Sequence, residues 1–409
     1  MIKKITEFKK LSNKKVILRA DYNIPIEEGK VDLESSWRIE ATLKTIRYLE
    51  QNHAKTIILC HLGRPEGNVV EDFRLKPIAA FLAKLLKKHL TVFNNKAAFF
   101  PQELQPLTET VYLISNNKTS LPEAMHSGDI LMLENIRFHP KEQENDQNFA
   151  KQLATIGDIY IDEAFATAHR EDASISGLPK LMPSAAGFLM EQEINTLIKI
   201  KDEAKKPLIF IMGGAKAETK TNLIQAFLPK CDAVLVGGVL ANTILAAQGI
   251  AIGKSIIDEE MAKNLNQLEI TNPKLHLPVD VIASSSKDGK SPIFIKPVGK
   301  LDKDKMILDI GPDTVLLFNA IIKNAETIIW NGPMGYTEVK KFSQGTEKIL
   351  EAIVNNKKAY KLVGGGESIA LLTKHKLLKK IDFVSTGGGA LLKFLAGEKL
   401  PGIEALKKH

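Results

Sequence analysis

The sequence predicts an α/β protein with two doubly wound parallel sheets, one in each of two lobes joined by a helix. The chain has 409 residues, more than a single hydrophobic core usually organises. Both halves alternate short apolar runs with helix-forming segments, the pattern of β-α-β units with helices on both faces of a sheet. A long segment of strong helix formers lies between the halves, and no low-complexity linker separates them.

The first half contains apolar runs of strand length and amphipathic segments between them. Four runs are candidate strands: Val16–Arg19, Thr56–Cys60, Ile130–Leu133 and Asp158–Ile161. Helices are expected at Ile39–Glu50 and Lys76–Lys88, where apolar residues recur every three or four positions. We therefore expect these strands to form one parallel sheet.

Polar clusters follow these strands, where an open parallel sheet binds its ligands. They are Asp21-Tyr22-Asn23, His61-Leu62-Gly63-Arg64, Glu134-Asn135-Ile136-Arg137 and His169-Arg170. Four of the chain's seven arginines (Arg19, Arg64, Arg137 and Arg170) lie in or near the strand ends, Arg38 opens a helix, and no arginine follows position 170. The planar guanidinium suits bidentate contacts with phosphate or carboxylate. Singly, His61 or His169 could be structural and Asp21 and Asn23 could form a turn; jointly they predict a basic pocket for a small, multiply anionic substrate.

The segment Ser184–Lys205 predicts the helix between the lobes, and the strands of the second half end repeatedly in glycine. The stretch from Pro207 to Leu223 reads as a buried strand, a Gly213-Gly214 turn and a helix start, an arrangement that can hold phosphate. Lys216 and Lys220 would share one face of that helix, where like charges repel unless an anion lies between them. A lysine-rich surface helix is the alternative.

Composition indicates a cytoplasmic protein. The N-terminus lacks the apolar region of a secretory signal, and no uncharged run is long enough to span a bilayer. Two cysteines, Cys60 and Cys231, give neither a disulfide framework nor zinc-ligand spacing. The net charge of +8 is compatible with nucleic acid, a membrane surface or small anions as partners.

Common nucleotide motifs are absent. Gly249–Ser255 has too few residues between its glycines for a Walker loop, and the Gly364 and Gly387 runs lack the last glycine of a dinucleotide fingerprint. The protein-kinase signatures are missing too. A bound nucleotide would therefore occupy a less common glycine-rich site.

Taken together, the motifs resemble the phosphoglycerate kinase family, in its order and over nearly the whole chain. They are Arg19–Pro25, His61–Pro65, Glu134–Phe138, Glu163–Arg170, Ala186–Glu191, Gly213–Lys220, Gly237–Thr243, Trp330–Gly335 and Ser385–Ala390. The resemblance implies two Rossmann-like lobes: an acid-binding lobe at 1–185, an interdomain helix at 186–205 and a nucleotide-binding lobe at 206–394. The tail, 395–409, is expected to pack back on the first lobe.

The resemblance also implies the reaction, the reversible glycolytic transfer of phosphate between ATP and the carboxylate of 3-phosphoglycerate. It gives a substrate site at Asp21, Tyr22, Asn23, Arg38, His61, Leu62, Gly63, Arg64, Arg137 and Arg170. It gives a nucleotide site at Gly214, Lys216, Lys220, Gly238, Asn331, Glu338, Gly365, Gly366, Glu367 and Ser368. Arg38, Lys216 and backbone N–H groups at Gly366 and Gly388 are expected to stabilise the transferring phosphate after the lobes close.

Magnesium is the expected cofactor, carried mainly by the nucleotide with Glu367 as its protein ligand, and no organic cofactor is expected. Two departures from the family pattern bear on the site: Glu367 stands where aspartate is usual, and Asp172 where a second histidine is usual. We expect a monomer that binds neither nucleic acid nor membrane. The alternatives are another small-acid kinase, an NAD-dependent dehydrogenase, or a non-enzymatic anion- or nucleic-acid-binding protein.

Overall fold

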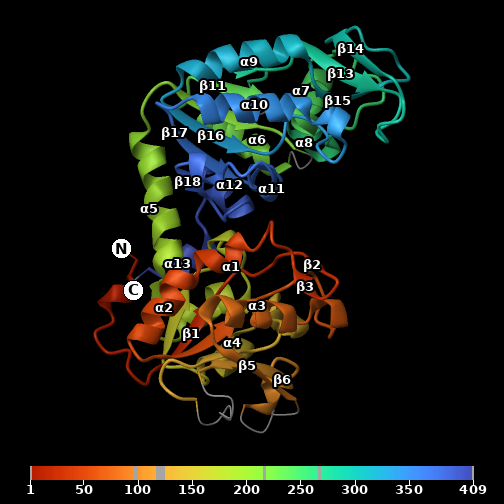
Figure 1. The fold of residues 1–409 in the computed structure, drawn as a ribbon. Helices are drawn as coiled ribbons and strands as arrows, with labels where there is room; N and C mark the ends of the chain where they lie inside the picture. The colour runs from red at the N-terminus through yellow and green to blue at the C-terminus, as the bar shows by residue number, and fades with distance from the viewer. Residues whose placement is uncertain (1, 95–99, 117–124, 215–217, 266–268, 408–409) are drawn as a thin grey trace. The chain divides into compact units, whose positions relative to one another are not determined.

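The computed structural model describes residues 2–94, 100–116, 125–214, 218–265 and 269–407, with only the backbone for 218–222 and 264. The chain divides into two compact units, Met1–Thr196 with Lys399–His409, and Leu197–Glu398 (Figure 1). None of the helices within these residues is long and apolar enough to cross a membrane.

The first unit is built on a seven-stranded sheet in the order β5-β6-β7-β4-β1-β8-β9. The strands are β1 Lys15–Arg19, β4 Lys55–Leu59, β5 His89–Asn94, β6 Thr110–Ser115, β7 Ile130–Met132, β8 Ile159–Asp162 and β9 Ser184–Ala186. The central strand β1 runs parallel to both β4 and β8. Its residues Val16–Arg19 are fully buried, which explains the continuous apolar run in the sequence.

The four predicted strands, β7, β4, β1 and β8, pair parallel as expected, but the whole sheet is mixed. Strand β6 pairs antiparallel with both β5 and β7 at one edge. Neither β5 nor β6 was among the predicted strands. Strand β5 is only partly buried, and its sequence HLTVFN mixes polar and apolar residues, so it lacks the continuous apolar run that marks the central strands.

The helices of the first unit are α1 Trp37–Ala41, α2 Leu43–Gln51, α3 Lys76–Leu86, α4 Gln147–Ala154 and α13 Pro401–Ala405. A short hairpin, β2 Ile26–Glu27 with β3 Lys30–Val31, precedes α1. The single helix predicted at Ile39–Glu50 is divided at Thr42. The Thr42 hydroxyl donates to the Ile39 carbonyl oxygen at 2.8 Å and pairs with the Tyr22 hydroxyl at 2.7 Å. This side-chain bond to the backbone explains the break.

Helix α5, Phe188–Glu203, follows β9, so the segment predicted as one helix from Ser184 begins as a strand. The buried Glu163 carboxylate accepts hydrogen bonds from the backbone N–H groups of Leu189 (3.2 Å) and Met190 (2.8 Å) in the first turn of α5. It therefore satisfies donors that a helix leaves unpaired at its N-terminus.

The C-terminal segment belongs to the first unit. In Figure 1 the blue helix α13 lies among the elements of that unit. The Gly402 N–H donates to the Ala168 carbonyl oxygen at 2.9 Å, and Ile2 forms a bridge with Lys407. A Cβ at Gly402 would lie 2.9 Å from Ile175, so the close approach requires glycine.

The second unit has a parallel six-stranded sheet in the order β12-β11-β10-β16-β17-β18. Its strands are β10 Leu208–Met212, β11 Ala233–Val236, β12 Leu275–His276, β16 Thr327–Asn331, β17 Tyr360–Gly364 and β18 Phe383–Val384. Its helices are α6 Glu218–Phe227, α7 Gly238–Ala247, α8 Glu259–Asn264, α9 Pro312–Asn324, α10 Gln344–Asn355, α11 Gly366–Lys374 and α12 Gly389–Ala396. In Figure 1, α9 and α10 lie on one face of this sheet, and α6 and α12 lie on the other.

A separate antiparallel sheet, β14-β13-β15, accompanies the second unit. It contains β13 Asp280–Ser284, β14 Ile293–Pro297 and β15 Met306–Ile310. Gly311 follows β15, so this glycine-ended strand lies in the separate antiparallel sheet and not in the main parallel sheet. Gly311 lies against Asp280, whose carboxylate accepts the N–H of Thr314 at 2.8 Å in the first turn of α9.

Candidate functional site

In the first unit, the candidate site lies where β1, β4, β7 and β8 end, and Asp21 is at its centre. Asp21 Oδ2 accepts Nη1 of Arg38 at 2.7 Å, and Asp21 Oδ1 accepts the Asn23 N–H at 3.2 Å. His61 Nδ1 lies 3.8 Å from Asp21 Oδ1. Residues that follow β1 and β4 are thus held together with an arginine from α1.

The loop after β4 is fixed by amide side chains. Asn23 Oδ1 accepts the Gly63 N–H at 2.9 Å. Asn135, which follows β7, donates through Nδ2 to the Leu62 carbonyl oxygen at 2.7 Å and accepts the Leu62 N–H at 3.2 Å. Arg137 then donates through Nη1 to the Gly63 carbonyl oxygen at 2.9 Å. The loop is therefore held by contacts from the segments after β1 and β7. Asn135 positions it; the sequence placed this residue in a polar cluster but not among the substrate-site residues.

Four arginines surround the fully buried His61. Burial is the main cause that lowers the pKa of His61 well below its usual value, followed by the charges of Arg19, Arg137, Arg170 and Arg38. His61 is therefore neutral at pH 7 and adds no charge. Burial, with the Arg170 charge as the second cause, lowers the pKa of Arg137 to about 10. Arg137 remains charged at pH 7, so the cluster is strongly positive.

Several guanidinium N–H groups in this cluster are buried and lack a hydrogen-bond partner among the described residues. They are Nη2 of Arg19, Nε and Nη2 of Arg137, and Nε of Arg170. A buried, unpaired charged donor is costly unless a ligand satisfies it. Donors of this type, gathered at one sheet edge, fit an anion with several oxygens.

A carboxylate also lies in the basic cluster. Asp172 Oδ2 is 3.7 Å from Nη2 of Arg137, and both side chains are buried. A second buried carboxylate nearby, that of Glu142, accepts a hydrogen bond from the Ser174 hydroxyl at 2.6 Å. The Ser174 hydroxyl oxygen in turn accepts a hydrogen bond from Nε of Arg19 at 2.8 Å. The Arg19–Ser174–Glu142 chain was not predicted, because its members are distant in sequence and neither Ser174 nor Glu142 belongs to a motif.

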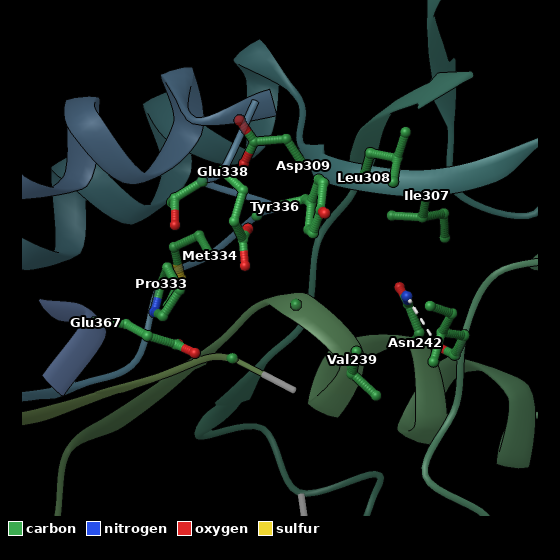
Figure 2. A pocket seen from close by; sticks show the side chains of 15 residues that line it. Val239, Asn242, Ile307, Leu308, Asp309, Pro333, Met334, Tyr336, Glu338 and Glu367 are labelled. Atoms are coloured by element: carbon green, nitrogen blue, oxygen red, sulfur yellow. Dashed lines mark hydrogen bonds between the residues drawn. The ribbon is translucent and has the colours of Figure 1, made fainter. Parts of the chain in front are cut away.

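In the second unit, a pocket lies beside the glycine-ended strands (Figure 2). It is lined by Gly214, Gly238, Val239, Asn242, Ile256, Ile307, Leu308, Asp309, Pro333, Met334, Gly335, Tyr336, Thr337, Glu338 and Glu367. Figure 2 shows the Glu338 and Glu367 side chains on one side, and Val239, Ile307 and Leu308 on the other. One end is thus acidic and the other apolar.

Backbone contacts explain the glycines around this pocket. The Gly214 N–H donates to the Pro333 carbonyl oxygen at 2.7 Å, and the Gly238 N–H donates to the Met334 carbonyl oxygen at 2.8 Å. A Cβ at Gly238 would lie 2.9 Å from the Gly214 nitrogen. The loops after β10, β11 and β16 can approach one another this closely only without side chains.

The first turn of α11 faces the acidic end of the pocket. Gly365, with φ of 91°, precedes α11, and Glu367 lies in its first turn. Ser368 Oγ accepts the Gly332 N–H at 2.9 Å, which ties the loop after β16 to the start of this helix. The Asn331 Nδ2 is buried beside Gly365 and has no hydrogen-bond partner within the described structure. A helix N-terminus with a spare donor beside it favours a phosphate group.

Comparisons with known proteins identify the family. The family model described as phosphoglycerate kinase matches residues 5–398. The chain belongs to the phosphoglycerate kinase family. The phosphoglycerate kinase of Moorella thermoacetica is 39% identical over 400 residues, which are 97% of each chain. That of Dictyoglomus turgidum is 40% identical over 401 residues, 97% of this chain and 96% of the relative.

Solved structures of the phosphoglycerate kinase family match over nearly their whole length. The Coxiella burnetii enzyme has a TM-score of 0.79 at 35% identity and covers 99% of both chains. The Pyrococcus horikoshii enzyme has a TM-score of 0.81 at 32% identity, with 99% of this chain and 98% of that one covered. The fold class and the kinase class expected from the sequence are thereby confirmed, and the dehydrogenase and non-enzymatic alternatives are not supported.

Not every predicted site residue of the family pattern directs its side chain to a pocket. The side chain of Tyr22 is buried in the apolar core, and Arg64 is exposed. Leu62 packs in the same core but also lines a pocket together with Asn23 and Gly63. Lys216 lies outside the described residues, and of Lys220 only the backbone, in α6, is described. Gly388 has φ of 45° and precedes α12. The apolar lining residues Val239, Ile307 and Leu308 were not predicted as site residues: Val239 occupies a variable position of the Gly237–Thr243 motif, and Ile307 and Leu308 lie in no motif.

Proposed function

We propose that the protein catalyses reversible phosphate transfer between ATP and the carboxylate of 3-phosphoglycerate, giving ADP and 1,3-bisphosphoglycerate, as a step of glycolysis. The observation that carries this proposal is the buried arginine cluster, with its unpaired N–H groups, in a chain of the phosphoglycerate kinase family. The substrate carries a phosphate and a carboxylate, the two groups that a guanidinium binds best. The negative charges of such a small acid are complementary to the positive charges of the arginine cluster at the edge of the sheet.

The acid site positions its substrate and supplies positive charge. A carboxylate nucleophile is ionised at pH 7, so the reaction requires no general base. His61 is neutral in this environment and serves as a hydrogen-bonding group. We assign Arg137 and Arg170 to the anionic groups of the acid, and Arg38, held by Asp21 at 2.7 Å, to the transferring phosphate.

The pocket of the second unit is assigned to the nucleotide. Its apolar side, formed by Val239, Ile307 and Leu308, suits a planar base, and the first turn of α11 suits the phosphates. Lys220 is assigned to the bound nucleotide, and Lys216 to the phosphate in transfer. Backbone N–H groups at Gly366 and Gly388 are proposed to complete the set of donors around that phosphate.

Magnesium fits this pocket as an ion carried by the nucleotide. The described residues contain no group of three or more His, Cys, Asp or Glu side chains that could hold a metal, and Glu367 contributes one carboxylate. Magnesium commonly binds through one or two carboxylates together with substrate phosphates. When bound, the ion would neutralise charge on the phosphate oxygens.

Direct transfer requires the acid and the nucleotide to meet with water excluded. Their proposed sites belong to different units of the chain, so we propose that the units close during turnover. Small-angle scattering with both substrates should show a smaller radius of gyration than the free protein. An unchanged radius would contradict closure. We also propose a cytoplasmic monomer that binds no nucleic acid or membrane, because four of its seven arginines are gathered around the buried His61; light scattering tests the oligomeric state.

A coupled assay tests the function itself. The protein should form acyl phosphate only when ATP, magnesium and 3-phosphoglycerate are all present. Arg38→Ala should abolish most of this activity, whereas Arg47→Ala, which removes an exposed arginine from the neighbouring helix α2, should leave it within about twofold. Turnover of another small acid in place of 3-phosphoglycerate, or full activity in both Arg38→Ala and Lys216→Ala, would overturn the proposal.

A further inference from the structure

The Asp172 carboxylate faces the Arg137 guanidinium. Its Oδ2 lies 3.7 Å from Nη2 of Arg137, within ion-pair distance but too far for a hydrogen bond. The Asp172 side chain is 8% exposed and that of Arg137 is 1% exposed. Oδ2 of Asp172 and both Nε and Nη2 of Arg137 lack hydrogen-bond partners among the described residues. The two groups are close, buried and unsatisfied.

Other contacts account for the position of the guanidinium and for the second carboxylate nearby. Arg137 is held by its hydrogen bond to the Gly63 carbonyl oxygen at 2.9 Å. Glu142 accepts both the N–H (2.9 Å) and the Oγ (2.6 Å) of Ser174. Asp172 is therefore the carboxylate that remains available to Arg137.

The charges around Arg137 explain what Asp172 does there. Arg170 and Arg19 repel the Arg137 charge, and Asp172 and Glu142 attract it. Asp172 thus offsets the repulsion among arginines that would otherwise be concentrated in a buried space. An anion that binds the free N–H groups of Arg137 must approach this carboxylate, and the two negative charges repel each other.

We infer that Asp172 is an internal counter-ion that competes with the anionic substrate for Arg137 and so limits the affinity of the acid site. This inference rests on the proposed function in taking 3-phosphoglycerate as the substrate. Asp172 acts through Arg137 and takes no part in the chemistry. Weaker binding of the ground state raises the KM for the acid and leaves the chemical step unaffected.

The test compares binding of 3-phosphoglycerate by calorimetry in matched variants of the full chain. Asp172→Asn removes the charge and keeps the shape of the side chain. The Kd of this variant for 3-phosphoglycerate should fall about tenfold, because one close charge repulsion is lost. Glu171→Gln removes the same charge from the adjacent, exposed residue and should change Kd less than about twofold. Asp172→Glu, which keeps the charge, should stay within about threefold of the wild type.

Kinetics give a second readout that a structural role would not move. In Asp172→Asn the KM for 3-phosphoglycerate and the inhibition constant of inorganic phosphate should both fall, with kcat within about threefold. A folded Asp172→Asn protein with unchanged or weaker binding would overturn the inference.

Failure to fold has its own outcome. If Asp172→Asn is unfolded, Asp172→Ser is the second neutral variant, and unfolding of both would show that Asp172 serves the fold instead. If the wild type does not bind 3-phosphoglycerate, the proposed function and this inference both fall. If the wild type binds it and the neutral variants gain nothing, the inference alone falls.

Discussion

Arg38 donates through Nη1 to Asp21 Oδ2 over 2.7 Å, and the Asp21 carboxylate also accepts the Asn23 N–H. One carboxylate therefore positions the arginine from α1 and the turn that follows β1. Because we propose that this arginine contacts the phosphate in transfer, we expect its orientation before substrate binding to contribute to the rate.

Removing the Arg38 guanidinium should cost activity. We expect Arg38→Ala to lower kcat by about 10³-fold, the effect typical of an arginine that stabilises a transferring phosphate. Asp21→Asn should lower kcat about tenfold, because Arg38 keeps its charge and loses its strongest partner. Stopped-flow single-turnover rates check both. A wild-type rate in Arg38→Ala would show that Arg38 does not stabilise the transferring phosphate.

Lys216 and Lys220 should have separable effects. Lys216→Ala is expected to lower kcat by about 10²- to 10³-fold with a nearly unchanged KM for ATP, the signature of an interaction made only in the transition state. Lys220→Ala should raise the KM for ATP about tenfold with a smaller effect on kcat. Steady-state kinetics at several ATP concentrations distinguish them, and identical effects of the two substitutions would contradict the division of roles.

Gly366 and Gly365 offer a matched pair of substitutions. A Cβ at Gly366 would have no described atom within 4 Å, whereas Gly365 has φ of 91° and a Cβ there would lie 3.1 Å from Asn331 Nδ2. Gly366→Ala should therefore melt like the wild type and bind ATP more weakly, because only the nucleotide would meet the methyl group. Gly365→Ala should lose about 1–2 kcal/mol of stability as well. Calorimetry of melting and of ATP binding measures both. If Gly366→Ala bound ATP as tightly as the wild type, the phosphates of ATP would not bind next to Gly366.

Glu367 should determine how much magnesium the enzyme requires. Glu367→Gln retains the size and removes the charge, and we expect the magnesium concentration for half-maximal rate to rise about tenfold. Glu203→Gln removes a charge from an exposed position at the end of α5 and should leave this requirement unchanged. Titration of the rate with magnesium at fixed ATP is the measurement. An unaltered requirement in Glu367→Gln would exclude Glu367 as a ligand.

The central strands of the first unit and the convergence of the polar clusters that follow them could be predicted from the sequence. The strands β1, β4, β7 and β8 coincide with the predicted runs to within one residue at each end, because buried central strands are continuously apolar. The carboxyl ends of parallel strands lie at one edge of the sheet, so the sequence alone predicts that Asp21, His61 and Arg137 lie near one another.

What could not be predicted depends on tertiary contacts. The break of the first helix arises from the contact of Thr42 with Tyr22, residues that no local pattern links. The direction of β6 depends on its pairing with β5 and β7 and not on its own residues. The closeness of Asp172 to Arg137 likewise follows from the packing of the segment after β8 against the segment after β7.

The pH dependence of stability should report on Glu163. Burial is the main cause that raises the pKa of Glu163 to about 7 in the folded protein, whereas a glutamate in the unfolded chain titrates near 4.3. At a pH between these two pKa values, Glu163 is protonated in the folded protein and ionised in the unfolded chain. The contribution of Glu163 to the free energy of unfolding therefore falls as pH rises from about 4.3 to 7, and it is constant above pH 7.

Glu163→Gln should remove this component. The melting temperature of the variant should fall less than that of the wild type between pH 5 and pH 8, and Glu203→Gln should behave as the wild type. Scanning calorimetry at several pH values checks this. Parallel curves for the wild type and Glu163→Gln would show that Glu163 does not titrate in this range.

The hydrogen bond from Gly402 to Ala168 also has a consequence for biosynthesis. Lys399–His409 leave the ribosome only after all of Leu197–Glu398, yet they belong to the unit that begins the chain. The second unit is one continuous stretch and can complete its folding during translation. The segment that carries His169 and Arg170, adjacent to Ala168, must wait for the C-terminal helix. A stalled or truncated chain should therefore contain a folded second unit, whereas its first unit still lacks the contact between Gly402 and Ala168.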